Sequence, residues 1–170
     1  KLIEALSLIE QLEDKFWRDR KTTEIKNVIA SCLGLYIDAV TNIHTATTGE
    51  KLKIDIEVTK RLEGNAVLHS FNFIPNGFDT LASVVLNDNS PYKYSGDFVI
   101  PKNINNTNSY WLNEKGSLGM YKVDKQEWIG LPETPKQIKV GFMFLIEGKD
   151  VYFEKDLSYR FNSPEDGETY

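Results

Sequence analysis

The stretch KLKIDIEVTK, residues 51–60, decides the fold class of this chain. Its apolar residues alternate strictly with lysine, aspartate, glutamate and threonine, and they are Leu52, Ile54, Ile56 and Val58. Successive side chains of a β-strand point to opposite faces of its sheet, so strict alternation is typical of a strand that is buried on one face and solvated on the other. The stretch therefore predicts a sheet with one buried face and one solvent-exposed face.

Similar runs follow along the chain and are separated by turn residues. They are LYIDAVTN (35–42), AVLHSFNFI (66–74), LASVVL (81–86), GDFVI (96–100), GMYKV (119–123) and IKVGFMFLIEGKDVYFEKDLSYRF (138–161). Within the last run, Glu147-Gly148-Lys149 has the composition of a hairpin turn. Many short strands without helical patterns between them predict an antiparallel, immunoglobulin-like β-sandwich of about seven strands.

The residues before the first strand follow a different period. Apolar side chains recur at three- and four-residue steps, first at Leu2, Ile3, Leu6, Ile9, Leu12 and Phe16 and then at Ile25, Val28, Ile29, Cys32 and Leu33. This spacing predicts two helices joined by the charged connection RDRKTT (18–23), with Thr23 capping the second helix and Gly34 ending it. We expect a helical hairpin over residues 1–34 and a sandwich over residues 35–170, giving a mainly β protein.

Composition excludes several classes of partner. The formal charge is −5, and the basic residues are scattered among acidic ones, so a nucleic-acid surface is not expected. No apolar run approaches the ~20 residues that span a bilayer, so no membrane span is predicted. Cys32 is the single cysteine, which excludes an internal disulfide. Its apolar neighbours predict a buried thiol.

The chain offers little for catalysis. A catalytic zinc site usually needs three protein ligands, and the only imidazole and thiol donors are His44, His69 and Cys32, with no close spacing among them. Glycine-rich phosphate loops, EF-hand calcium loops and G-x-S-x-G elbows are absent from the sequence. We therefore predict no catalytic residue, no metal site, no cofactor and no enzymatic activity for this fragment.

An aromatic segment, NNTNSYWLNEKGSLGMYKVDKQEWIGLPETP (105–135), offers a candidate binding site. Tyr110, Trp111 and Trp128 could form a platform on which a sugar ring stacks, because flat rings cover much area with little loss of entropy. Alternatively, the rings could close the end of a hydrophobic core, which is the commoner role of large aromatics. We expect Trp111 to fold into the sandwich edge and pin the loop, while Tyr110 fits either interpretation.

Several spaced segments together resemble a known family. They are KFWRDRKTTEIKNVIASCLGLYIDAVT (15–41), TGEKLKIDIEV (48–58), DFVIPKNINNTNSYWL (97–112), GMYKVDKQEWIGLPETP (119–135) and SYRFNSPEDGETY (158–170). They resemble the region that follows the catalytic domain in long bacterial PIG-L/LmbE-type N-acetylglucosaminyl deacetylases. The resemblance covers nearly the whole chain and implies a helical connector and an immunoglobulin-like sandwich attached to an enzyme, in the periplasm or at the cell surface.

The sequence departs from the family at the catalytic site. Catalysis in the family uses a zinc motif of the A-H-P-D-D kind, and neither His44 nor His69 is followed by an Asp-Asp pair. No catalytic residue carries over. The resemblance thus implies a non-catalytic accessory part, whose partner is a catalytic domain upstream on the same chain.

Two features refine this expectation. The chain begins at Lys1 rather than methionine, which predicts an excised fragment, and the apolar stripe of Leu2, Leu6 and Ile9 is expected to dock on the upstream domain. The alternative is a carbohydrate-binding module that presents Tyr110, Trp111 and Trp128 to a glycan.

Overall fold

The computed structural model describes residues 1–75, 77, 79–165 and 167–169. Its helices are α1 (Leu2–Ile9) and α2 (Lys15–Cys32), with single 3-10 turns at Tyr110–Leu112 and Gln126–Trp128. The strands are β1 (Tyr36–Thr41), β2 (Lys51–Thr59), β3 (Ala66–Ile74), β4 (Thr80–Val85), β5 (Tyr92–Val99), β6 (Lys139–Ile146), β7 (Lys149–Asp156), β8 (Ser158–Tyr159), β9 (Phe161–Ser163) and β10 (Gly167–Thr169).

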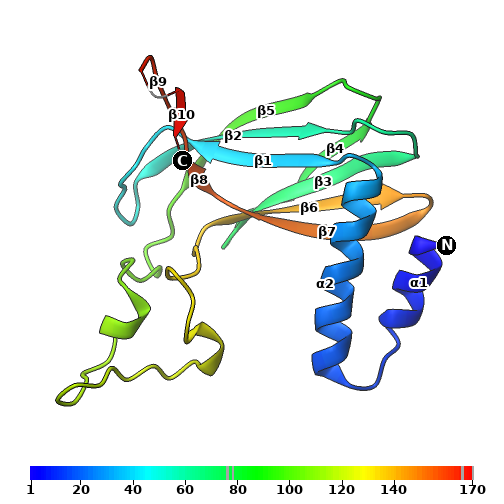
Figure 1. Cartoon of the computed structure of the whole chain (residues 1–170). Coiled ribbons are helices and arrows are strands. Elements are labelled where there is room, and N and C mark those ends of the chain that lie inside the picture. The colour runs from blue at the N-terminus through cyan, green and yellow to red at the C-terminus, as the bar shows by residue number, and fades with distance from the viewer. Residues whose placement is uncertain (76, 78, 166, 170) are drawn as a thin grey trace.

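Two four-stranded sheets form the body of the molecule (Figure 1). Their strand orders are β5-β2-β1-β8 and β4-β3-β6-β7, and neighbouring strands run antiparallel except for β1 and β8. The chain passes from one sheet to the other between β2 and β3 and again between β4 and β5, as in immunoglobulin-like sandwiches. The predicted fold class, mainly β with a helical hairpin at the N-terminus, is confirmed.

The core lies between the two sheets. The alternating residues of β2 (Leu52, Ile54, Ile56 and Val58) are all buried, as predicted, and they share one cluster with Phe71, Phe142 and Phe144 of the opposite sheet. The outer face of β2 carries charged side chains that pair across the sheet, such as Lys51 with Asp97 at 3.3 Å. Alternation therefore separates the dry face from the wet one.

The helical hairpin packs against the sandwich rather than standing apart from it. Leu6 of α1 and Ile29 of α2 belong to the same buried cluster as the strands. The ammonium of Lys149 donates hydrogen bonds to Ser7 Oγ (2.7 Å) and to the Glu10 carboxylate (2.6 Å), which ties α1 to the start of β7. The base of the hairpin is thus fixed to the sheets by packing and by polar contacts.

Gly34 ends α2 as the sequence predicted. Its φ of +55° is in the left-handed region, where glycine has no steric penalty. The Gly34 N–H donates to Ser31 O (3.0 Å), and the Leu35 N–H donates to Ala30 O (2.8 Å). This pair of bonds is the Schellman motif, which closes the helix and directs the chain into β1.

The predicted start of the second helix is wrong. Asp14 is the N-cap, its carboxylate accepting from the Trp17 N–H at 3.2 Å, and α2 runs through the segment expected to be a connection. Thr23 lies inside α2 and donates to Asp19 O instead. The apolar spacing continues across the turn by coincidence, so periodicity alone misplaced the boundary, whereas Asp14 carries the true capping signal.

The buried thiol expected at Cys32 is also wrong, because Cys32 is exposed. The side of α2 that faces the sandwich is set by Ile25, Ile29 and Leu33, which follow one another at steps of four. Val28 and Cys32 form the neighbouring row, which faces solvent. No described helix is both long and apolar enough to cross a membrane.

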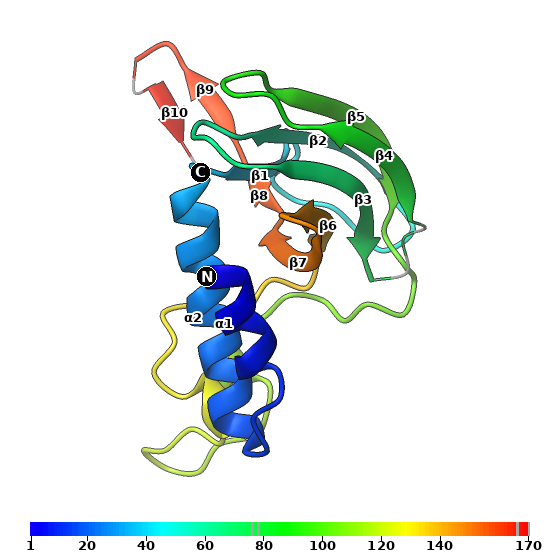
Figure 2. The same ribbon diagram turned by 90° about the vertical axis from the view of Figure 1, so that its right-hand side faces the viewer.

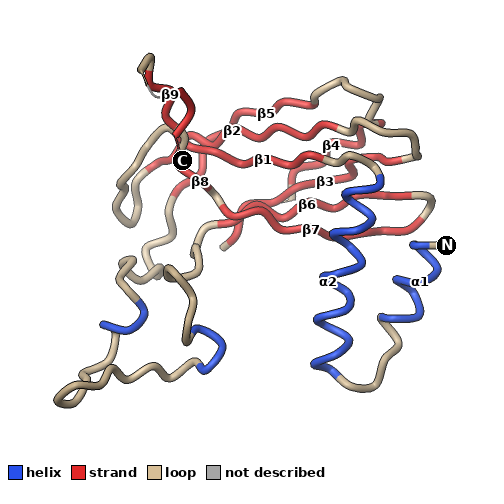
Figure 3. Tube along the Cα trace, viewed as in Figure 1, coloured by secondary structure: helices blue, strands red, loops and turns tan. Residues whose placement is uncertain are grey.

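A long connection between β5 and β6 forms a separate lobe. Residues 101–138, here called the aromatic lobe, contain two short helical turns and otherwise irregular chain (Figure 3). The strand predicted at GMYKV (119–123) is wrong, since only an isolated bridge joins Ser117 to Met120 there. The lobe and the turn between α1 and α2 project from the same side of the sandwich (Figures 1 and 2).

Candidate functional site

Tyr110 is the anchor of the aromatic lobe. Its side chain is buried, at 7% exposure. Its backbone N–H donates to Thr134 Oγ1 (2.9 Å), and its hydroxyl donates to the Leu131 carbonyl (3.1 Å). The Thr134 hydroxyl in turn donates to Asn108 O at 2.7 Å. These bonds join the two halves of the lobe, which lie more than twenty residues apart in sequence.

The three aromatic residues predicted from sequence meet around this anchor. The ring centroids of Tyr110 and Trp111 lie 4.9 Å apart and those of Tyr110 and Trp128 lie 6.3 Å apart, both edge to face. The ammonium of Lys125 lies 4.2 Å from the centroid of the Trp128 ring, which covers one face of that ring. The structure therefore brings all three residues together, with Tyr110 in the middle.

The expectation that Trp111 closes the edge of the sandwich is wrong. Trp111 is half-buried and contacts Tyr110 within the lobe. Among the described residues, the sandwich core receives only Ile104 and Ile138 from the lobe, near its two ends. The loop is pinned by Tyr110, because a phenol can bury its ring and still place its hydroxyl on a carbonyl.

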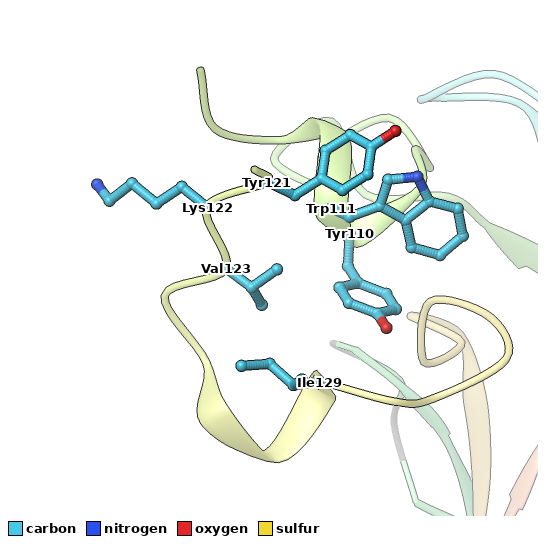
Figure 4. Close-up of a pocket in the computed structure, with 6 residues that line it drawn as sticks. All are labelled: Tyr110, Trp111, Tyr121, Lys122, Val123 and Ile129. Atoms are coloured by element: carbon cyan, nitrogen blue, oxygen red, sulfur yellow. The ribbon is translucent and has the colours of Figure 1, made fainter. Parts of the chain in front are cut away.

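Trp111 forms one wall of an open pocket of about 550 Å³ (Figure 4). The pocket is lined by Tyr110, Trp111, Tyr121, Lys122, Val123 and Ile129. Figure 4 shows Val123 and Ile129 across the cavity from the Trp111 ring, while the ammonium of Lys122 points away from it. Trp128 does not line this pocket. The walls are thus mainly aliphatic and aromatic.

Few polar atoms in this pocket are available to a ligand. The Tyr110 hydroxyl already donates to Leu131 O, and the Lys122 ammonium lies 3.4 Å from an Asp124 carboxylate oxygen. Lining side chains that still offer hydrogen bonds are the Tyr121 phenol and the Trp111 indole N–H. Such a pocket favours an apolar group over a hydroxyl-rich one, because a buried polar group without a partner is unfavourable.

A protruding turn lies beside the pocket. Ser117 and Met120 exchange backbone hydrogen bonds of 3.0 and 3.3 Å around Gly119, whose φ is +81°. Leu118 at the tip of this turn is fully exposed, and Met120 is 71% exposed. A second hollow of about 470 Å³ between this turn, Trp111 and Tyr121 continues the same surface.

The two histidines of the chain lie outside the aromatic lobe. His44 packs edge-on against Tyr159 at a centroid distance of 5.2 Å, and His69 is exposed on β3. In the described part of the chain, no three His, Cys, Asp or Glu side chains gather where they could share a metal ion. Burial raises the pKa of Tyr92 on β5 and of Tyr152 on β7, both outside the lobe.

Sequence reasoning missed Tyr121, Val123 and Ile129 as pocket residues. The first two were assigned to a strand, because alternating apolar residues after a glycine resemble a strand start. The signal that could have found them is the same alternation, since Tyr121 and Val123 at i and i+2 both line the pocket.

No family model matches this chain, and no curated protein matches it. Among solved structures, the chain is similar to Spo0M, a sporulation control protein from Bacillus subtilis, with a TM-score of 0.37 and 10% sequence identity. The similarity covers 73% of this chain and 49% of Spo0M, so the chain spans about half the length of that protein. A likeness of this strength carries no conclusion about function.

Proposed function

We propose that this chain is a non-catalytic accessory module that holds a partner protein domain through its aromatic lobe. The proposed partner is the zinc-dependent catalytic domain of a PIG-L/LmbE-type deacetylase, upstream on the same polypeptide. The observation that carries the proposal is the apolar pocket beside Trp111, whose rim exposes several large hydrophobic side chains.

The rim has the character of an interaction surface. Tyr121 is 69% exposed and Ile129 is 55% exposed, and Leu118 and Met120 extend the same surface at the protruding turn. Soluble proteins seldom expose neighbouring large hydrophobic residues unless a partner covers them. Aromatic residues and methionine are enriched at the centres of protein interfaces, which fits this composition.

The family resemblance supports the same surface. Two of the segments that carry it, 97–112 and 119–135, contribute Trp111, Tyr121 and Ile129 to the pocket, and Tyr110 links the two segments through Leu131. The resemblance, which covers nearly the whole chain, therefore includes the segments that build this surface.

The apolar stripe of Leu2, Leu6 and Ile9 was expected to dock on the catalytic domain. This proposal assigns the docking surface to the aromatic lobe instead. Leu6 is fully buried in the chain's own core, so it is not available to a partner. Ile9 is partly buried and Leu2 is 37% exposed, which leaves no continuous apolar face on that side of α1. The docking surface therefore moves to the aromatic lobe.

The test begins with the gene. We expect the coding sequence ahead of residue 1 to encode a domain with an A-H-P-D-D motif, and the purified domain should bind this chain in trans by surface plasmon resonance. Tyr121→Ser with Ile129→Ser should weaken binding by about 10- to 100-fold, the range of interface hot spots. Val99→Ser, on the outer face of β5 and 55% exposed, is the matched control. Absence of the motif, or equal binding by both variants, overturns the proposal.

A glycan is the second candidate ligand, because Tyr110, Trp111 and Trp128 gather in one cluster. The covered face of Trp128 and the engaged hydroxyl of Tyr110 reduce what the cluster can offer to a sugar. Titration with cell-wall and host glycans, followed by tryptophan fluorescence, distinguishes the candidates. A saturable change that is lost in Trp111→Ala would favour the glycan, and no change with any glycan would exclude it.

A further inference from the structure

Strand β5 lies at the edge of its sheet and presents unpaired backbone groups to solvent. It pairs with β2 along its whole length, from Tyr92 to Val99, without a shift of register. The backbone of Ile100, directly after β5, bonds to Gly49 and Glu50 on the side of β2. Because the bonding direction alternates along an antiparallel strand, the odd-numbered residues of β5 turn their N–H and C=O groups away from β2. In the described part of the chain, no strand pairs with this side, here called the free edge of β5.

The edge strand of the opposite sheet, β4, is built differently. Its pairing with β3 shifts register between Leu68 and Ser70, and Ser83 within β4 has a φ of +49°. Bulges of this kind twist an edge strand and keep it from pairing with other chains. Strand β5 has neither a bulge nor a proline between Tyr92 and Val99, so its free edge is regular enough to accept another strand.

The side chains along the free edge are complementary to themselves. Lys93, Ser95 and Asp97 are exposed on the outer face of the sheet. When two copies of β5 run antiparallel with Ser95 facing Ser95, each Lys93 faces Asp97 of the second copy. Antiparallel registers centred on Lys93 or on Asp97 instead place like charges opposite each other, which is destabilising. The charges therefore select one register.

Charges on β2 extend this match across the joined sheet. Glu57 is the register partner of Lys93, and its carboxylate lies 3.3 Å from the Lys93 ammonium. Lys53 is the register partner of Asp97. In the antiparallel arrangement, one row of side chains crosses both copies of the two strands. Its order is Glu57, Lys93, Asp97 of the second copy and Lys53 of the second copy, and the sign of the charge alternates at every step.

The inner face of β5 also has apolar surface left to bury. Tyr92 and Tyr94 pack against the core but are only half-buried, since β5 ends the sheet. In the selected register, Tyr94 faces Gly96 of the second copy and Tyr92 faces Phe98 of the second copy. A strand added at the free edge covers the outer sides of these rings, and burial of apolar surface favours association.

We propose that β5 pairs with β5 of a second copy of this chain, about a two-fold axis between the two Ser95 residues. The partner is a second copy because the charges of the free edge are complementary to themselves in one register. A two-fold contact is closed, so association stops at a dimer. The dimer joins two sandwiches through one continuous sheet and carries two aromatic lobes. The proposal does not depend on what the aromatic lobe binds.

Charge reversal tests the register. Sedimentation velocity at concentrations up to about 1 mM should show that the wild type dimerises. Lys93→Asp and Asp97→Lys each place like charges opposite each other in their own dimer, so each should raise the dissociation constant at least about 10-fold. A one-to-one mixture of the two variants restores opposite charges at both positions and should dimerise like the wild type. Lys155→Asp, the same change at an exposed position of β7, is the matched control.

A backbone variant tests the edge itself. Ser95→Pro removes an N–H that points away from β2, where proline is tolerated in an edge strand. It should abolish the dimer while the thermal unfolding of the dilute protein stays close to that of the wild type. A wild type that remains monomeric at about 1 mM overturns the proposal. So does a mixture of the charge variants that associates no better than each variant alone, or a dimer that Ser95→Pro leaves intact, because the contact then lies on another surface or in another register.

Discussion

At the scale of single residues, Tyr110 explains why a long, asparagine-rich segment holds one shape. A phenylalanine at this position could bury its ring, but it has no polar group with which to reach the Leu131 carbonyl. Tyr110 instead reaches Leu131 O through its hydroxyl and Thr134 through its backbone N–H. One residue thereby closes the lobe on itself while leaving Trp111 to form the pocket wall.

Replacing Tyr110 with phenylalanine should loosen the lobe without unfolding the sandwich. The change removes one hydrogen bond, which contributes about 0.5–1.5 kcal/mol, and leaves the Leu131 carbonyl without this donor. Hydrogen exchange should therefore speed up in residues 108–134, while β2 and β6 keep their protection. Tyr121→Phe is the matched control, because that side chain is 69% exposed. Equal exchange in the two variants would show that the hydroxyl is not the anchor.

Lys60 is a second residue that can be tested, because its ammonium is buried. The ammonium lies at the end of β2, donates to Leu62 O at 3.0 Å and pairs with the carboxylate of Asp88. Asp88→Ala should lower the free energy of unfolding by about 1–3 kcal/mol, because it leaves a buried charge with a lost partner. Asp97→Ala removes an exposed ion pair with Lys51, and it should change the free energy of unfolding by less than about 1 kcal/mol. Urea unfolding of both variants measures the difference, and equal values would mean that water reaches Lys60.

At the scale of elements, the hairpin has two different sides. Leu6 is completely buried against the sheets, whereas Leu8, two residues later, is 67% exposed. Leu6→Ala should reduce the free energy of unfolding by about 2–5 kcal/mol, the range for a buried leucine. Leu8→Ala should change it by about 0.5 kcal/mol or less. Urea midpoints decide: if both variants unfold like the wild type, α1 is not part of the cooperative core.

The elements that sequence predicted well are those whose pattern is local. The alternation of β2 and the turn at Glu147-Gly148, where both residues have positive φ, are encoded within a few residues. The start of α2 was misplaced because apolar spacing runs on through Asp14, and the capping signal is weaker than the period. Cys32 was misjudged because periodicity shows that a helix has an apolar side but not how wide the covered side is.

The candidate site was predictable only in part. Tyr110, Trp111 and Trp128 were visible as neighbouring aromatics, yet which ring is buried depends on Thr134 and Leu131, more than twenty residues away. Contacts of that range leave no periodic trace in the sequence. The exposure of Phe16 was also not predicted. Its spacing fitted the buried stripe, and only the turn after α1, which comes earlier than expected, places it in solvent.

At the scale of the whole molecule, stability should fall at alkaline pH. Burial raises the pKa of Tyr92 and of Tyr152 above the ordinary value of 10.0, helped by Tyr94 in the first case and by Glu154 in the second. The folded protein then holds protons that the unfolded chain releases, so the free energy of unfolding is undiminished below about pH 10 and declines above it. Lys139 acts in the same direction: burial lowers its pKa, but the hydrogen bonds and charges of Glu154 and Asp156 together outweigh burial and raise it.

Urea midpoints measured between about pH 9 and 11 check this dependence. The wild type should lose stability over this range, and the double variant Tyr92→Phe with Tyr152→Phe should lose less, because it removes two of the linked groups. Tyr121→Phe, at an exposed position, should follow the wild type. A double variant with the same slope as the wild type would contradict the assignment of these two phenols.

The two ends of the aromatic lobe meet where it leaves the sandwich, with Gln137 Nε2 donating to Asn105 O at 3.0 Å. A segment whose ends already touch can be lengthened, exchanged or deleted with little loop-closure entropy at stake, since each doubling of loop length changes it by only about 0.6 kcal/mol. The sandwich therefore serves as a frame with an insertion point between β5 and β6. A different recognition loop can be inserted there, by evolution or by design, while Ile104 and Ile138 still pack against the core at the two ends of the insertion.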